Sequence, residues 1–103
     1  MVKILLISRD LNYIWALRKS FSKYSIELDF VFTISEANMR LEKINYDLII
    51  LDNLREYELQ FLQKNKIKNT PLLGVDMENL SFKSFQKENS SFMLSYIKDN
   101  FKL

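Results

Sequence analysis

Two short aliphatic runs stand out in the pattern of hydrophobic and polar positions along the chain. The first spans residues 48–51 and ends at Asp52, and the second spans residues 2–7, broken only by Lys3, and ends at Ser8. A run without a polar face is typical of a strand that is covered on both sides, in the middle of a parallel sheet. A short apolar run can also belong to a buried helix, but the β-branched isoleucines and the abrupt polar ends favour strands.

Three other segments have the composition of strands. Residues 26–32 alternate between apolar and polar positions, which predicts an edge strand with one covered face. Residues 72–75 follow Pro71, which opens the strand where no ladder hydrogen bond is lost, and they end at Asp76. Residues 82–87 are a candidate fifth strand.

Helical periodicity occupies the segments between these strands. Asp10 stands at an N-cap position, and Thr33 and Glu36 have the spacing of a capping box. Apolar residues recur at spacings of three and four after Asp10, at Leu11, Ile14, Leu17, Phe21 and Tyr24. Tyr13 and Trp15 lie off this stripe, and Trp15 is expected either to pack halfway against a neighbour or to contact a partner. Residues 54–65 and 90–103 predict two further helices.

The alternation of strands and helices predicts a doubly wound α/β sheet with helices on both faces. The alternation breaks after Asp76, because only residues 77–81 precede the candidate fifth strand. A parallel crossover with its helix needs about ten to twelve residues or more. Either a helix is missing, therefore, or the fifth strand is not parallel.

Composition narrows the function. The 103 residues suffice for one domain, residues 1–103, and a net charge of +2 with mixed signs gives no reason to expect a nucleic-acid or membrane partner. The absence of cysteine and histidine removes thiolate and imidazole nucleophiles and the usual zinc and haem ligands. No segment resembles a signal peptide or a membrane-spanning helix. We therefore expect a cytoplasmic protein that is not an enzyme.

The order of these segments resembles the receiver domains of two-component response regulators, which have a flavodoxin-like (CheY-like) fold. The stretches that carry the resemblance are KILLIS at residues 3–8, SEA at 35–37, YDLIILD at 46–52 and TPLLGV at 70–75. It covers residues 2–76 well and residues 82–103 loosely. The resemblance implies a parallel five-stranded sheet in the order 2-1-3-4-5, with the fourth helix missing or reduced.

The resemblance also assigns the positions at which such domains are phosphorylated. Asp52 matches the aspartate that accepts the phosphoryl group. The acidic pair that holds Mg²⁺ in the family falls on Ser8 and Arg9, and only the next residue, Asp10, is acidic. The resemblance thus supplies the phosphoacceptor but not its usual metal ligands.

Two further family positions fall late in the chain. The hydroxyl residue that closes the fourth strand falls on Asp76, and the conserved lysine of the fifth strand falls on Lys87. A carboxylate at position 76 is expected to repel a bound phosphoryl group, because it brings a negative charge where the family has a hydroxyl donor. Of the family's five positions only two, Asp52 and Lys87, are met in this chain.

These departures suggest that Arg9 replaces the metal. Mg²⁺ prefers carboxylate oxygens in an octahedral array, whereas arginine is always protonated and binds carboxylates through two N–H groups. We expect Arg9 to occupy the place of Mg²⁺, bonded to Asp52 or Asp76. The alternative is that Arg9 points to solvent.

Two functions follow from the resemblance. The first is a pseudo-receiver, which signals or scaffolds through protein contacts without a cofactor. The second is a working receiver that is phosphorylated on Asp52 in a phosphorelay, with Asp10 and Asp76 completing a Mg²⁺ site. An unrelated flavodoxin-like ligand binder is disfavoured, because the turns after the strands have no glycines that would let a phosphate approach.

The C-terminal segment is rich in aromatic residues that cannot all face one small core. They are Phe82, Phe85, Phe92, Tyr96 and Phe101. One expectation is that they collapse inward and fill the volume of the missing helix. The other is that some of them form an apolar patch for a homodimer or a protein partner, on the face that partners contact in receiver domains.

Overall fold

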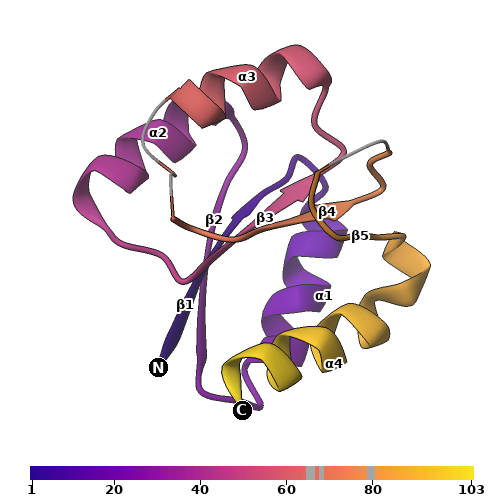
Figure 1. Ribbon diagram of the computed structural model, residues 1–103. Helices are drawn as coiled ribbons and strands as arrows, with labels where there is room; N and C mark the ends of the chain where they lie inside the picture. The colour runs from indigo at the N-terminus through magenta and orange to yellow at the C-terminus, as the bar shows by residue number, and fades with distance from the viewer. Residues whose placement is uncertain (65–66, 68, 79–80) are drawn as a thin grey trace.

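Five parallel strands form one sheet, as the sequence predicts. The computed structural model describes residues 1–64, 67, 69–78 and 81–103. The order of the strands is β2-β1-β3-β4-β5, and every neighbouring pair is parallel (Figure 1). The strands are β1 (Val2–Ile7), β2 (Ile26–Val31), β3 (Leu48–Asp52), β4 (Leu72–Val75) and β5 (Ser84–Phe85). This confirms the predicted flavodoxin-like order 2-1-3-4-5.

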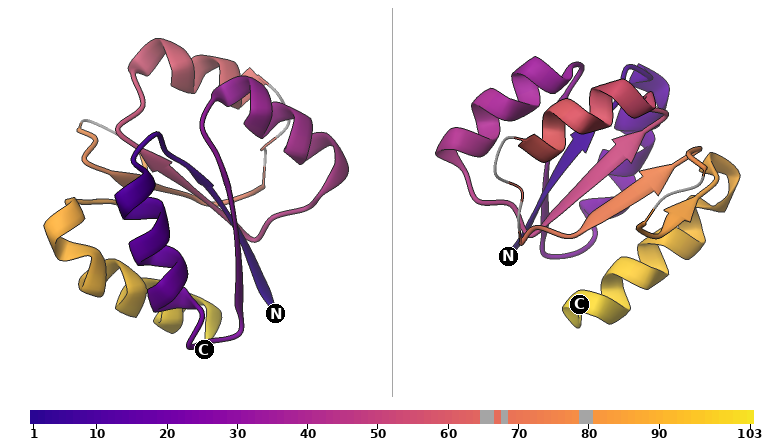
Figure 2. Two further views of the ribbon diagram at one scale, coloured as in Figure 1. Left: turned by 180° about the vertical axis from the view of Figure 1, so that it is seen from behind. Right: turned by 45° about the horizontal axis from the view of Figure 1, so that its top comes forward.

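Helices cover both faces of the sheet. They are α1 (Leu11–Phe21), α2 (Ile34–Lys43), α3 (Glu56–Lys64) and α4 (Ser90–Phe101), with a short 3₁₀ turn η1 (Lys87–Asn89) before the last. Helices α1 and α4 lie on one face, and α2 and α3 lie on the other (Figures 1 and 2). None of the helices in the described ranges has the length and apolar character that crossing a bilayer requires.

The two central strands divide their side chains between two cores. Leu6 and Ile50 pack toward α1 and α4, whereas Ile7 and Ile49 pack toward α2 and α3, and all four are fully buried. Because side chains alternate along a strand, a strand buried on both faces needs an unbroken aliphatic run. The runs at residues 2–7 and 48–51 are therefore confirmed as central strands.

The break in the pattern after β4 results from a missing helix. Strand β5 pairs in parallel with β4, with Gly74 opposite Ser84 and Val75 opposite Phe85. The described residues between these strands, 76–78 and 81–83, contain no helix. The fifth strand is thus parallel, and it is shorter than the predicted 82–87.

The predicted helix starts are confirmed by hydrogen bonds. The Asp10 carboxylate accepts from Tyr13 N at 3.1 Å, and the Thr33 hydroxyl accepts from Glu36 N at 3.1 Å. The predicted stripe of α1 is wrong at its first turn, because Tyr13 is buried and Leu11 is exposed. The reason is that the Tyr13 hydroxyl lies 3.0 Å from Ser90 Oγ at the start of α4, which draws the ring inward.

A buried tyrosine joins the loop before β3 to the edge strand. Tyr46 donates its hydroxyl hydrogen to Asp29 Oδ2 on β2 at 2.6 Å, and Arg40 on α2 lies 3.6 Å from the same carboxylate oxygen. Burial of the phenol and its hydrogen bond to Asp29 raise the pKa of Tyr46 to about 12. The neutral phenol is therefore part of the folded state.

Candidate functional site

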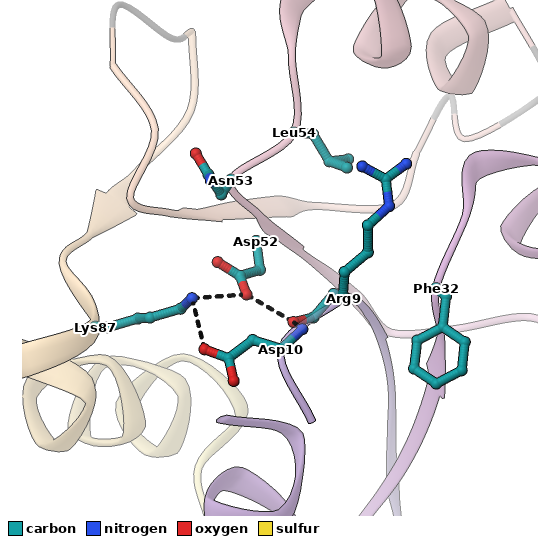
Figure 3. Close-up of a pocket in the computed structure, with 8 residues that line it drawn as sticks. Arg9, Asp10, Phe32, Asp52, Asn53, Leu54 and Lys87 are labelled. Atoms are coloured by element: carbon teal, nitrogen blue, oxygen red, sulfur yellow. Dashed lines mark hydrogen bonds and ion pairs between the residues drawn. The ribbon is translucent and has the colours of Figure 1, made fainter. Parts of the chain in front are cut away.

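A polar cleft of about 250 Å³ lies at the carboxyl ends of β1 and β3 (Figure 3). In open α/β sheets this edge is where ligands bind, because the loops that follow neighbouring parallel strands meet there. The residues that line the cleft are Ser8, Arg9, Asp10, Phe32, Asp52, Asn53, Leu54 and Lys87. The structure thus brings five of the six predicted pocket residues together, and the sixth, Asp76, does not line the cleft.

Asp52 is buried at the end of β3 and has one engaged and one unengaged oxygen. Its Oδ2 accepts a hydrogen bond from Ser8 Oγ at 2.6 Å and lies 3.1 Å from Lys87 Nζ. Its Oδ1 is buried and has no hydrogen-bond partner among the described residues. Oδ2 is therefore already hydrogen-bonded and ion-paired within the chain.

Lys87 is the cation that pairs with Asp52 in this cleft. Its ammonium group lies 3.1 Å from Asp10 Oδ2 and 3.1 Å from Asp52 Oδ2, so it bridges the ends of β1 and β3 (Figure 3). Burial lowers the pKa of Lys87, but the hydrogen bonds to Asp10 and Asp52 outweigh it and raise the pKa above its usual value. The hydrogen bond from Lys87, followed by that from Tyr13 N, lowers the pKa of Asp10.

Asp76 holds Lys87 in place from outside the cleft. It has a left-handed backbone conformation with φ of 52°, which aspartate tolerates better than most residues. Its Oδ1 accepts from Lys87 N at 3.0 Å, and its own N–H donates to Phe85 O at 2.9 Å. The repulsion of a phosphoryl group by Asp76 stays a prediction, since its carboxylate does not line the cleft and accepts from the backbone of Lys87.

The expectation that Arg9 bonds to Asp52 or Asp76 is wrong. The Arg9 guanidinium lies 3.1 Å from Glu58 Oε2 on α3 and extends away from Asp52 (Figure 3). Ser8 is the residue that turns inward at this point, so the side chain of Arg9 is directed outward, largely into solvent, where Glu58 is its partner. The alternative that Arg9 points to solvent is correct, because its side chain is largely exposed, but Arg9 also forms an ion pair with Glu58.

Sequence reasoning missed Glu58. Its second oxygen, Oε1, accepts from Arg55 N at 3.2 Å at the start of α3. A glutamate three residues after the start of a helix is the second half of a capping box. Position 55 is arginine rather than serine or threonine, so only half of this motif is present, and nothing in the sequence places Glu58 beside Arg9.

Comparisons with known proteins find structural similarity only. No protein-family model and no curated protein matches the sequence. A two-component response regulator from Clostridium difficile superposes with a TM-score of 0.82 at 18% identity, over 99% of this chain and 97% of that one. The chain has the fold of a response-regulator receiver domain. Salmonella typhimurium RcsB, a response regulator whose structure is described for its DNA interaction, superposes with a TM-score of 0.76 at 11% identity, over 98% of this chain and 59% of that one.

Receiver domains of known function use Mg²⁺, so we asked whether this receiver fold has residues that fit the ion. Mg²⁺ prefers octahedral oxygen ligands, including one or two carboxylates. Asp10 and Asp52 are already joined by the ammonium group of Lys87, and Glu58 is paired with Arg9. Within the described ranges no group of three or more acidic, histidine or cysteine side chains could hold a metal ion. The residues of the cleft do not fit Mg²⁺.

The C-terminal aromatic residues divide between core and surface. Phe82 packs partly against the core beneath α2 and α3, and Phe85 packs against the opposite core and lies 5.7 Å from the ring of Tyr96. Phe92 is 66% exposed, and Tyr96 is also exposed. Phe82, Phe85 and Phe101 pack partly inward, as the first expectation has it, whereas Phe92 and Tyr96 remain on the surface of α4, where a patch for a partner stays a prediction.

Proposed function

We propose that the protein is a pseudo-receiver: a cytoplasmic signalling or scaffolding module, not an enzyme, that acts through protein contacts without Mg²⁺-dependent phosphorylation. The state of Asp52 carries this proposal. One carboxylate oxygen is held by Ser8 and Lys87, and the other is buried. Neither oxygen is available to attack a phosphodonor unless these contacts are broken.

The charge of the cleft supports the same function. Phosphoryl transfer to a carboxylate brings two anions together, and catalysis depends on neutralising them with metal ions and cationic side chains. Here two carboxylates share one ammonium group, which leaves a net charge of −1 around Asp52. Arg9 adds nothing to this sum, because Glu58 neutralises it. An incoming phosphate would therefore meet a negative site.

The output of such a module is a protein contact, and α4 supplies a suitable surface. Phe92 and Tyr96 are exposed on α4, and the ring of Tyr96 lies beside that of Phe85. We propose that this C-terminal face binds a protein partner or a second copy. The RcsB structure concerns a protein that interacts with DNA, whereas the net charge of +2 on this chain favours a protein partner over nucleic acid.

One observation favours a working receiver as the second candidate. Lys87 lies 3.1 Å from Asp52, and these two residues are the family positions that this chain meets. If the bridge to Asp10 opens, the same residues could serve a phosphorylated state. The two candidates differ in whether Asp52 ever becomes phosphorylated.

Incubation with a small-molecule acyl phosphate and Mg²⁺, followed by intact mass spectrometry, separates them. We expect no phosphoryl adduct on the wild-type protein, because both oxygens of Asp52 are withheld. Asp52→Asn is the matched control, since it removes the acceptor and should likewise show no adduct. An adduct on the wild type that is missing from Asp52→Asn would establish the working receiver instead.

A further inference from the structure

The edge of the sheet at β2 is open. Strand β2 is the outermost strand, and among the described residues its one partner strand is β1 (Figure 2). The Ser25 carbonyl accepts a hydrogen bond from Val2 N at 2.9 Å, and the Val31 carbonyl accepts one from Ser8 N, directly after β1, at 3.0 Å. Because backbone groups alternate in direction along a strand, Leu28 and Phe30 direct their N–H and C=O groups away from β1. These groups face the open edge.

This edge has few of the features that normally prevent association. Exposed edge strands are usually interrupted by lysine, proline or a bulge, or they are very short. Strand β2 has six residues, IELDFV, none of which is lysine or proline, and its register with β1 is unbroken. Of its two carboxylates, Asp29 is held by Tyr46 and Arg40 within the chain, and Glu27 is exposed. The edge is therefore a template for another strand.

Aromatic rings line the same edge. The ring of Phe30 lies 6.3 Å from Trp15 on α1 and 5.9 Å from Phe32, and the Arg18 guanidinium lies 5.4 Å from Trp15 and 5.8 Å from Phe30. Trp15 is 56% exposed and Phe32 is 39% exposed. These values fit the expectation that Trp15 packs halfway against a neighbour.

A groove of about 380 Å³ runs along this edge between α1 and α2. Its charged lining consists of Arg18, Arg40, Asp29 and Glu36, two cations and two anions. A balanced set of charges does not select a strongly acidic or basic peptide. It does suit a surface that pairs with its own copy.

We propose that this edge is the interface with a second copy of the chain, in which β2 pairs antiparallel with β2 around a two-fold axis at Phe30. Charge selects this register. An axis at Asp29 would place two Asp29 carboxylates opposite each other, and an axis at Leu28 would place Glu27 opposite Asp29. An axis at Phe30 places Asp29 opposite Val31 and avoids both repulsions.

The same register suits the backbone and the aromatic rings. Phe30 directs both of its backbone groups outward, so two copies exchange a pair of hydrogen bonds at the axis. Phe30 then faces Phe30 of the second copy on the side of the sheet that carries Trp15, and Phe32, which follows the end of β2, comes near Leu28 of the second copy. Cross-strand aromatic pairs of this kind stabilise antiparallel strands. The two sheets become one continuous sheet.

Sedimentation velocity over a wide range of protein concentration tests this dimer. The mass should double as the concentration rises, and the emission of Trp15, the single tryptophan, should shift to shorter wavelength in step. Hydrogen exchange at the Leu28 and Phe30 amides should slow by about tenfold or more in the dimer. A monomer at every concentration would overturn the proposal and would leave the edge to an extended segment of a different protein.

Two lysine substitutions distinguish this interface from the C-terminal face. Phe32→Lys should keep the protein monomeric, whereas Phe92→Lys, at a more exposed aromatic on α4, should leave the dimer intact. The reverse result would overturn the β2 interface and assign the dimer to α4. Exchange at Leu28 and Phe30 in the wild type decides the question if Phe32→Lys does not fold. The inference does not depend on whether Asp52 is phosphorylated.

Discussion

Replacing Lys87 with methionine is expected to lower the free energy of unfolding at neutral pH by about 3–5 kcal/mol, the usual cost of removing one partner of a buried ion pair. Asp52 would remain in place with its side chain 3% exposed and its charge unmatched. Methionine keeps the length and the apolar stem of the side chain, so lost packing adds little. Urea denaturation of both proteins measures the difference.

Dependence on pH separates this mechanism from a general loss of packing. In the wild type, the raised pKa of Lys87 contributes stability that is lost only as the pH rises above 10.5, and the lowered pKa of Asp10 contributes stability that is lost only as the pH falls below 3.8. The Lys87→Met protein lacks the lysine and the hydrogen bond that lowers the pKa of Asp10, so its stability should change less at both extremes of pH.

Two controls complete the Lys87 experiment. Lys23→Met, at an exposed lysine after α1, should change the free energy of unfolding by no more than about 0.5 kcal/mol. Adding Asp52→Asn to Lys87→Met should restore part of the lost stability, because the uncharged amide no longer needs a cation. If Lys87→Met matched the wild type in both stability and pH profile, the bridge would have no energetic role.

The second large effect is expected at alkaline pH, at Tyr46. Its pKa is raised from 10.0 to about 12, so between these values the phenol ionises in the unfolded chain and stays neutral in the folded one. The wild type should therefore lose on the order of 2 kcal/mol as the pH rises through this range. Tyr46→Phe should abolish this part of the loss, and at neutral pH it should cost about 1 kcal/mol for the hydrogen bond to Asp29.

Tyr57→Phe is the matched control for Tyr46→Phe, because Tyr57 lies exposed on α3. The stability of the Tyr57→Phe protein should depend on pH in the same way as that of the wild type. Denaturant unfolding at a series of pH values from neutral to strongly alkaline provides the comparison. If Tyr46→Phe and Tyr57→Phe gave the same alkaline profile, burial at position 46 would not hold the phenol neutral.

The sequence predicted the parts of the fold that depend on local pattern. The aliphatic run at residues 48–51 can only be covered on both faces, and the capping residues Asp10 and Thr33 fix the starts of α1 and α2 through bonds within one turn. The length of β5 was not predictable in this way. It depends on which residues of the segment after β4 reach Gly74 and Val75, a long-range choice.

The sequence predicted most of the residues that form the candidate site, but not which of them pair with each other. Asp52 and Lys87 were identified, yet the predicted cation partner of Asp52 was Arg9. At the end of β1 one residue turns inward and the next turns outward, and Ser8 is the inward one. The partner of Arg9, Glu58, lies 49 positions along the chain, so sequence spacing gave no indication of the pair. Which cation reaches a buried carboxylate is decided by tertiary packing.

The central claim is that Lys87, rather than a divalent ion, neutralises Asp52 in a receiver fold. The most direct measurement is the amide NMR spectrum of the ¹⁵N-labelled wild type during titration with Mg²⁺ and beryllofluoride, which imitates a phosphoryl group on aspartate. The account predicts no saturable shift at Asp52, Asn53 or Lys87. Saturable shifts centred on these three amides, seen only when both reagents are present, would contradict it.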